Sequence, residues 1–184
     1  MTIRKLFPNE ATKLCGHLGR LTPDERALRF MGGLDDEAVE AHCVHLNWFR
    51  TVVLGFFEEG VLRGAAELHV ADSHFPILCE VAITVETAWQ DHGMATELLR
   101  RALLIARNRS ARAVQLNCIW DNFRIQHVAH KFGAHFCNEA GESVAEIITP
   151  APTYSSMCQE MLDDALGWVN LWFDQIPPRR PALA

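Results

Sequence analysis

The chain has little of what marks secreted or metal-binding proteins. Its six cysteines are scattered and include no Cys-x-x-Cys pair, so we expect reduced thiols and a cytoplasmic location. Nine histidines are present. None forms His-Glu-x-x-His, and none pairs with a cysteine at zinc-ligand spacing, so the sequence predicts no metal site.

Long apolar runs and an excess of basic charge are also missing. No stretch approaches the roughly 20 apolar residues that cross a membrane, and Met1–Pro8 lacks the apolar core of a secretory signal. Acidic residues outnumber basic ones by 23 to 17, which gives a net charge of −6. A general nucleic-acid binder normally has a basic surface. We therefore expect neither a nucleic-acid partner nor a membrane partner.

The composition, 49% apolar and 22% charged, is that of one ordinary globular domain. The capping box at Thr22–Glu25 starts the first predicted helix. In order, the patterns predict helices at 23–30 and 35–46, strands at 51–57, 61–71 and 77–86, a helix at 94–108, a strand at 114–120, a helix from a cap at 121–122 to 132, a hairpin of 135–138 and 144–149, and a helix at 156–173. This order favours a mixed α/β or α+β sheet over residues 1–150, followed by a helical extension and tail over 151–184.

The last predicted helix has an apolar face. Its residues are Met157, Met161, Ala165, Trp168, Val169 and Trp172. Such a face more often packs on its own domain, where it could cover the sheet, but it could also contact a partner subunit. The sequence therefore leaves a homodimer open.

The most informative segment is the glycine-bearing turn Gln90–Ala95, which lies between an apolar strand pattern and a strongly helical run. The first turn of a helix has unpaired N–H donors and a partial positive charge, and both attract phosphate. Gly93 allows the backbone to approach a ligand closely. The turn therefore predicts a site for a phosphate-bearing cofactor. A nucleotide-binding P-loop is disfavoured, because no Gly-Lys-Ser/Thr follows and the turn is short.

Two motifs carry a resemblance to a known family. Residues 85–98 read Val-x-Thr-x-Trp-Gln-x-x-Gly-Met-Ala-Thr-x-Leu, which resembles motif A of the GNAT family of N-acetyltransferases, although Thr87 stands where many members have proline. Asn122 and the segment Lys131-Phe132-Gly133-Ala134 resemble the motif B helix of that family. The resemblance extends from about Leu46 to Thr149.

Two further stretches resemble a subgroup of the family. The segment 21–32 (Leu-Thr-Pro-Asp-Glu-Arg-x-x-Arg-Phe-Met-Gly) and the strand 79–85 (Cys-Glu-Val-Ala-Ile-Thr-Val) are similar to the acetyltransferase domain of bacterial Pat-type protein lysine acetyltransferases. Because the chain lacks the additional domains of some of those proteins, the resemblance does not imply their protein substrate.

The resemblance implies a GNAT fold, with a mixed, mostly antiparallel central sheet, helices on both faces and splayed central strands. It implies an acyltransferase that moves an acetyl group from acetyl-CoA, without a metal, to a primary amine. That amine could be a protein lysine, a peptide amino terminus or a small amine. The residues it assigns to acetyl-CoA are Val81, Ile83, Val85, Gln90, Asp91, His92, Gly93, Met94, Ala95, Thr96 and Asn122. The Asp91 carboxylate is expected to point away from the phosphates or to cap the helix.

Glu80 is the predicted general base, because the Pat-type family places its catalytic glutamate on this strand. Burial among Leu78, Val81 and Phe75 is expected to strengthen it as a base. A strand-edge glutamate in a surface ion pair is the alternative interpretation, and Glu67 is a reserve candidate.

The expected general acid is missing, since the family's tyrosine position is Ala129 and the only tyrosine, Tyr154, lies outside the motifs. His130 could substitute or could be a solvated helix histidine. A catalytically silent acyl-CoA-binding sensor therefore remains the alternative function. Arg26 and Arg29 could line the acceptor mouth or bind the 3′-phosphate of CoA, but surface pairing with Asp24 and Glu25 is the expected interpretation.

Overall fold

The computed structural model describes residues 1–70, 76–119, 122–139 and 142–174, and the side chains of these except 138, 139, 142 and 170–174. The elements in chain order are β1 (Thr2–Lys5), the 3-10 turn η1 (Pro8–Glu10), α1 (Ala11–Arg20), α2 (Pro23–Phe30), α3 (Asp36–Val44), β2 (Thr51–Glu58), β3 (Val61–Val70), β4 (Leu78–Val85), the 3-10 turn η2 (Thr87–Trp89), α4 (Met94–Asn108), β5 (Ala113–Ile119), α5 (Phe123–His130), β6 (His135–Glu139), β7 (Glu142–Ile148) and α6 (Tyr154–Asp174).

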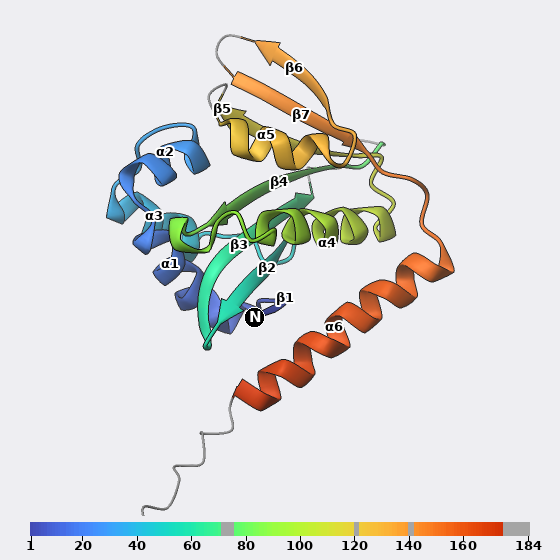
Figure 1. The fold of residues 1–184 in the computed structure, drawn as a ribbon, viewed down its shortest axis with the longest axis horizontal. Coiled ribbons are helices and arrows are strands. Elements are labelled where there is room, and N and C mark those ends of the chain that lie inside the picture. Colours follow the sequence, from blue (N-terminus) through green and yellow to red (C-terminus); the bar gives the residue numbers. More distant parts are fainter. Residues whose placement is uncertain (71–75, 120–121, 140–141, 175–184) are drawn as a thin grey trace, which may run out of the picture.

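One sheet organises the molecule, with strand order β1-β2-β3-β4-β5-β7-β6. Every neighbouring pair is antiparallel except β4 and β5, which are parallel. Helices α4 and α5 cover the face seen from the front in Figure 1, and α1 to α3 gather on the other side. The expected mixed, mostly antiparallel α/β fold with helices on both faces is confirmed.

Strands β4 and β5 pair over only three residues, from Leu78 opposite Ala113 to Glu80 opposite Gln115. Beyond that point β4 continues beside β3 as far as Val85, while β5 continues beside β7. The two central strands therefore separate, and the main chain of the second half of β4 lacks a β5 partner. This separation creates the space for a groove between the two strands.

The sheet is packed on both faces. Strand β2 sends Leu54 and Phe56 into the core under α4, and Val53 and Phe57 into the core under α1 and α3. A bulge between Phe56 and Phe57 shifts the register of β2 against β3. Because both faces are buried, the strand reads as a continuous apolar run rather than an alternating one.

Local sequence signals specify several boundaries. Thr22 and Glu25 form the expected capping box, with Glu25 N–H donating to Thr22 Oγ1 at 3.3 Å and Thr22 N–H donating to Glu25 Oε2 at 2.7 Å. Between β2 and β3, Glu59 and Gly60 both have positive φ, the geometry of a two-residue hairpin turn. The connection between the predicted strands 61–71 and 77–86 lies mostly outside the described residues, while the predicted hairpin is confirmed by the antiparallel pairing of β6 and β7.

The amino-terminal region differs from the prediction of two helices before the first strand, because β1 and α1 precede them. Strand β1 is only four residues long. Its Arg4 is buried and forms an ion pair with Glu10, in which Nη1 donates to Oε2 at 2.8 Å and Nη2 donates to Oε1 at 2.7 Å. Helix α1 contains Gly16 and Gly19, which lower its helix propensity. Neither element therefore has a strong signal of its own.

The apolar face predicted for the last helix points away from the domain. Met161 and Trp168 are 72% and 54% exposed, whereas Ser156 and Gly167 on the opposite side are buried. On this face Trp168 contacts the domain, with its ring centroid 5.2 Å from that of Phe7, while Met157, Met161 and Val169 are exposed; Trp172 lies beyond the described side chains. None of the helices in the described ranges combines the length and apolar character that a membrane span requires.

Candidate active site

A groove of about 770 Å³ opens where β4 and β5 separate. Its walls are the first turns of α2, the end of β4, the turn before α4 with the first residues of α4, and one face of α5. The elements come from distant parts of the chain and meet only because the sheet splits there. The groove is large enough for an extended ligand of cofactor size.

The start of α4 presents bare backbone to this groove. Gly93 is the N-cap residue with φ of 80°, Asp91 also has positive φ, and no side chain caps the helix. The first N–H groups of a helix have no intrahelical partner, so those of Met94, Ala95 and Thr96 are available to an anion. A Cβ placed on Gly93 would meet no atom within 4 Å, so the space beside Gly93 is open, and Gly93 to Thr96 all line the groove. The arrangement fits a diphosphate.

The turn before α4 is held by two side chains. Gln90 Nε2 donates to Val85 O at 2.8 Å, which fastens the turn to the end of β4. Arg124 on α5 donates to Gln90 Oε1, and its Nη1 lies 3.3 Å from Asp91 Oδ2. The Asp91 carboxylate is exposed and does not cap α4. Arg124 therefore places a cation directly beside the turn before α4.

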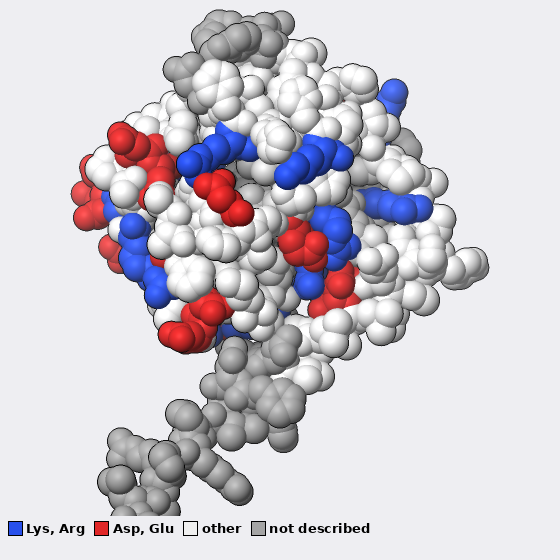
Figure 2. Space-filling model, in the orientation of Figure 1, with Lys and Arg blue, Asp and Glu red and all other residues white. Residues whose placement is uncertain are grey.

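Helix α5 supplies groove residues that sequence reasoning missed. Arg124, His127, Val128 and Lys131 line the groove together with Asn122, which also caps α5 by accepting from Ile125 N–H at 3.3 Å. Figure 2 shows basic side chains along the outer surface in the region of α5. Their three- and four-residue spacing along the motif B helix was a signal that could have identified this face.

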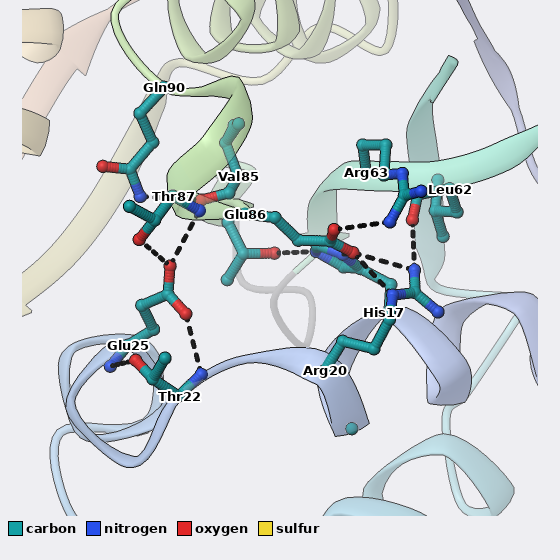
Figure 3. Close-up of polar contacts among 12 residues, drawn as sticks. His17, Arg20, Thr22, Glu25, Leu62, Arg63, Val85, Glu86, Thr87 and Gln90 are labelled. Atoms are coloured by element: carbon teal, nitrogen blue, oxygen red, sulfur yellow. Dashed lines mark hydrogen bonds and ion pairs between the residues drawn. The ribbon is translucent and has the colours of Figure 1, made fainter. Parts of the chain in front are cut away.

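The α2 wall of the groove is joined to the segment after β4 by Glu25. Its Oε1 accepts from Thr87 N–H at 3.0 Å and from the Thr87 hydroxyl at 2.6 Å, while Oε2 accepts from Thr22 N–H (Figure 3). Burial alone would raise the pKa of Glu25, but these hydrogen bonds outweigh it and lower the pKa. One carboxylate thus fastens the start of α2 to the end of β4.

A buried histidine, His17, lies near this contact between α2 and the end of β4. His17 Nδ1 is 3.2 Å from Glu86 Oε1, and Nε2 is 2.8 Å from Thr84 Oγ1 (Figure 3). Burial is the largest influence on the pKa of His17 and lowers it, which favours the neutral ring. A carboxylate only accepts, so Nδ1 donates to Glu86 and Nε2 accepts from the Thr84 hydroxyl. Arg20 and Arg63 also bind Glu86, so the cluster anchors α1 and β3 to the end of β4.

Most residues assigned to acetyl-CoA lie along this groove. The lining includes Ile83, Val85, Gln90, Asp91, Gly93, Met94, Ala95, Thr96 and Asn122. Val81 is outside it, with its side chain buried in the core under α4. His92 is also outside, with Nδ1 2.6 Å from Gln90 O.

Glu80 is exposed, so its expected burial is wrong, and Phe75 lies outside the described residues. Its Oε1 accepts from Asn117 Nδ2 at 2.7 Å, and its Oε2 has no partner among the described side chains. Glu80 is the last β4 residue that β5 pairs, so it stands at the point where the strands separate. It is not in the groove lining and lies three residues before Ile83, roughly 10 Å along the strand.

Glu67, the reserve base, is enclosed in a buried ion pair. Arg29 Nη2 donates to Oε1 at 2.7 Å, and His42 Nε2 lies 2.8 Å from Oε2. Burial would raise the pKa of Glu67, but the charge of Arg29 and the contact with His42 lower it from 4.5 to about 2. Such a carboxylate holds a proton too weakly to act as a general base near neutral pH.

The two arginines of α2 do not pair with the acidic residues beside them. Arg26 binds Asp36 Oδ1 at 2.6 Å and Gly19 O at 2.7 Å, while Arg29 reaches Glu67. The expected pairing with Asp24 and Glu25 is therefore wrong, because the helix directs both guanidinium groups toward other elements. Arg29 also lines the groove, whereas Arg26 does not.

Position 129 on α5 offers no acid, because the side chain of Ala129 is a methyl group, and it is fully buried. His130 is exposed, and its ring centroid lies 4.4 Å from that of Phe136. On the same helix His127, rather than His130, lines the groove. Within the described ranges, no group of three or more histidine, cysteine or acidic side chains is placed to hold a metal ion.

Comparison with known proteins agrees with this geometry. Among solved structures, the chain is similar to the GNAT domain of S. lividans PAT, with a TM-score of 0.69 and 20% identity over 79% of this chain and 89% of that one. It is also similar to a GNAT-family acetyltransferase from Streptococcus pneumoniae, with a TM-score of 0.65 and 19% identity over 80% and 98% of the two chains. A putative acetyltransferase from Salmonella typhimurium, solved with acetyl-CoA, gives a TM-score of 0.60 and 18% identity over 84% and 98%.

Likeness at this identity establishes the fold, while the family rests on the sequence itself. No curated protein sequence matches the chain. The profile of the Acetyltransferase (GNAT) family matches residues 21–134, which is more than half of the 184 residues and contains the α2 wall, the α4 turn and α5. The chain therefore belongs to the GNAT family of acetyltransferases.

Proposed function

We propose that the protein is an acetyl-CoA-dependent N-acetyltransferase that acetylates a primary amine, with Glu80 as the general base. The observation that carries the proposal is the uncapped start of α4, whose bare amides face an open groove at the separation of β4 and β5. A metal has no part in the proposed reaction.

Different groove residues would hold different parts of acetyl-CoA. The main chain of Gly93 to Thr96 would hold the diphosphate, and Arg124 and Lys131 would add positive charge. The pantetheine arm would run along the part of β4 around Ile83 and Val85 that β5 leaves unpaired, with Asn122 on the facing side. The Salmonella relative with acetyl-CoA supports this cosubstrate for the fold.

The chemistry needs an amine without its extra proton, because an alkylammonium of pKa near 10.4 has no lone pair for attack. Glu80 would accept that proton at Oε2, while Asn117 holds Oε1. The amine nitrogen then bonds to the thioester carbon, the C–S bond breaks to release the CoA thiolate, and the second proton that the nitrogen loses on becoming an amide goes to that thiolate or to water. A free thiol has a pKa of about 8.5, so the thiolate can depart without a side-chain acid, consistent with alanine at position 129.

The diphosphate site is tested by adding a methyl group to Gly93. Gly93→Ala should weaken acetyl-CoA binding about tenfold or more, since the Cβ enters the space in front of the α4 amides. Isothermal titration calorimetry gives the dissociation constant, and thermal unfolding gives the stability.

Gly60 provides the matched control. It also has a positive φ, 75° against 80° for Gly93, and open space around its Cα, but it lies in the β2–β3 turn away from the groove. Both alanine variants should lose about 1–2 kcal/mol of stability from the left-handed backbone, and only Gly93→Ala should lose affinity. Equal affinities, or no heat with acetyl-CoA for the wild-type protein, would contradict the proposed site.

Transfer is tested separately from binding. Acetyl-CoA with a panel of lysine peptides, peptides with free amino termini and small amines should release free thiol at least with one acceptor class, at a rate above the amine-free background. A thiol-reactive dye measures this release. Tight binding of acetyl-CoA without release on any amine would favour the alternative, a catalytically silent acyl-CoA sensor, which the absent acid at Ala129 motivates.

A further inference from the structure

Helix α6 is attached to the domain through its charged side. Lys5 Nζ on β1 binds Glu160 Oε1 at 2.8 Å and Asp164 Oδ2 at 2.7 Å. Arg100 on α4 binds Asp163 Oδ2 at 3.0 Å. These contacts come from two elements and reach two adjacent turns of α6, so the rotation of the helix about its axis is specified.

Close backbone contact fixes the same rotation. Gly167 is buried, and a Cβ built on it would lie 2.8 Å from Arg4 Cβ, so only glycine allows this approach to β1. Near the other end of the described helix, Ser156 is buried and its Oγ donates to Asn108 Oδ1 at 2.5 Å. The face turned toward the domain is therefore polar or small along its length.

The opposite face is apolar and exposed. Its large side chains are all at least 45% exposed: Tyr154, Met157, Met161, Leu162, Leu166, Trp168 and Val169. Among the exposed residues of α6 whose side chains are described, none is charged. In Figure 2 the described surface of α6 is largely white, beside a group of basic and acidic side chains. Monomeric proteins seldom expose one continuous apolar patch of this kind.

The spacing on this face is that of a helix-pairing seam. Tyr154, Cys158, Met161, Ala165 and Trp168 follow one another at intervals of four, three, four and three residues. All five are exposed, and Trp168, at the end of the seam, also contacts Phe7, with 5.2 Å between the ring centroids. This is the a/d pattern by which one helix packs against another helix. The seam spans two heptads, too short for an isolated coiled coil but adequate for helices that are already held on folded domains.

The charge of the chain indicates which kind of partner would cover the exposed face of α6. An interfacial membrane helix normally has Lys or Arg on its polar side, whereas the sides of α6 carry Glu160, Asp163 and Asp164 and the chain has a net charge of −6. An uncharged seam needs an uncharged partner surface, and a second copy of α6 provides one with the same spacing. A two-fold pair would bury both faces at once.

We propose that two copies of the protein associate through the exposed faces of α6 and form a two-fold dimer. The acid–base contacts with Lys5 and Arg100 hold each helix in place so that its apolar seam is presented outward. The groove lies on the side of α4 toward α5 and α2, so acetyl-CoA binding does not depend on this contact.

Sedimentation velocity on the full chain measures the association. We expect a species of twice the 20.7 kDa chain mass that grows between about 5 and about 100 µM protein. Met161→Glu and Leu162→Glu should each raise the dimer dissociation constant about 100-fold or more, because the pair buries two unpaired carboxylates. Gln159→Glu, which adds the same charge at an exposed polar position on the same helix, should leave most of the dimer intact.

Thermal unfolding and acetyl-CoA calorimetry on each variant show whether the domain itself is intact. A wild-type chain that stays at 20.7 kDa, or a dimer that survives both seam variants, overturns the proposal. So does a dimer that forms only after removal of residues 175–184, because the tail would then be the occupant. Cosedimentation of a monomer with anionic phospholipid vesicles would assign the face to a membrane instead.

Discussion

Glu80→Gln should lower kcat for amine acetylation about 100- to 10,000-fold, the usual contribution of a general base. Glutamine keeps the shape of glutamate and can still contact Asn117, which lies 2.7 Å from Glu80 Oε1, but it cannot take a proton from an ammonium group. The dissociation constant for acetyl-CoA should stay within about twofold, because Glu80 lies outside the groove lining. Steady-state thiol release and calorimetry measure the two quantities.

Glu40→Gln is the matched control, since Glu40 is an exposed glutamate on α3 and takes no part in the proposed chemistry. It removes the same charge and should leave kcat within about twofold. The pH profile separates loss of a base from loss of shape. If Glu80→Gln turns over at the wild-type rate between pH 6 and 9, deprotonation of the acceptor amine does not need this carboxylate. An amine that reaches the groove already neutral would then be the simpler account.

The turn before α4 was predictable because its determinants are local. A strand pattern, Gly93 and a long helical run are adjacent in sequence, and the structure adds only the positive φ and the absence of a side-chain cap. The same holds for the α2 boundary, where Thr22 and Glu25 form the capping box within four residues. Backbone chemistry of this kind does not depend on tertiary contacts, so it can be read before the fold is known.

Contacts between distant elements were not predictable in the same way. Glu25 has a second role, because its other oxygen binds both the N–H and the hydroxyl of Thr87, 62 residues away. Many family members have proline at the Thr87 position, which would offer neither donor. The departure at Thr87 thus accompanies a contact that joins α2 to the segment after β4. Arg124 is a similar case, since its distance from Gln90 depends on how α5 lies against α4.

The rotation of α6 shows how a correct pattern can be assigned the wrong environment. The apolar face was visible in the sequence, but an amphipathic helix normally turns that face inward. Here Lys5 and Arg100 supply partners for the acidic side, and Gly167 permits close contact with β1. The basic partners lie about 60 and 155 residues earlier in the chain. Without these contacts, the sequence favoured the opposite orientation.

Removal of the Glu67 carboxylate should cause the largest loss of stability. Glu67 is 6% exposed and binds both Arg29 and His42, so Glu67→Gln leaves the Arg29 guanidinium with no carboxylate partner in a poorly solvated site. Breaking a buried pair from one side typically costs about 3–5 kcal/mol. Urea unfolding at pH 7 measures the change. Asp36→Asn is the control, because it breaks the Arg26 ion pair at an acid that is 89% exposed and should cost less than about 1 kcal/mol.

Acidification should remove the difference in free energy of unfolding between the wild-type protein and Glu67→Gln. The folded-state pKa of Glu67 is lowered from 4.5 to about 2, so its stabilisation is complete above the unfolded pKa and is lost as the pH falls from about 5 toward 2. A shift of this size corresponds to about 3 kcal/mol, in line with the cost expected from the substitution. The two free energies of unfolding should therefore converge on acidification, while other carboxylates affect both proteins alike. A difference that stays constant from pH 7 to pH 3 would mean that the substitution acts through packing at the α2–β3 contact and that the carboxylate charge contributes little.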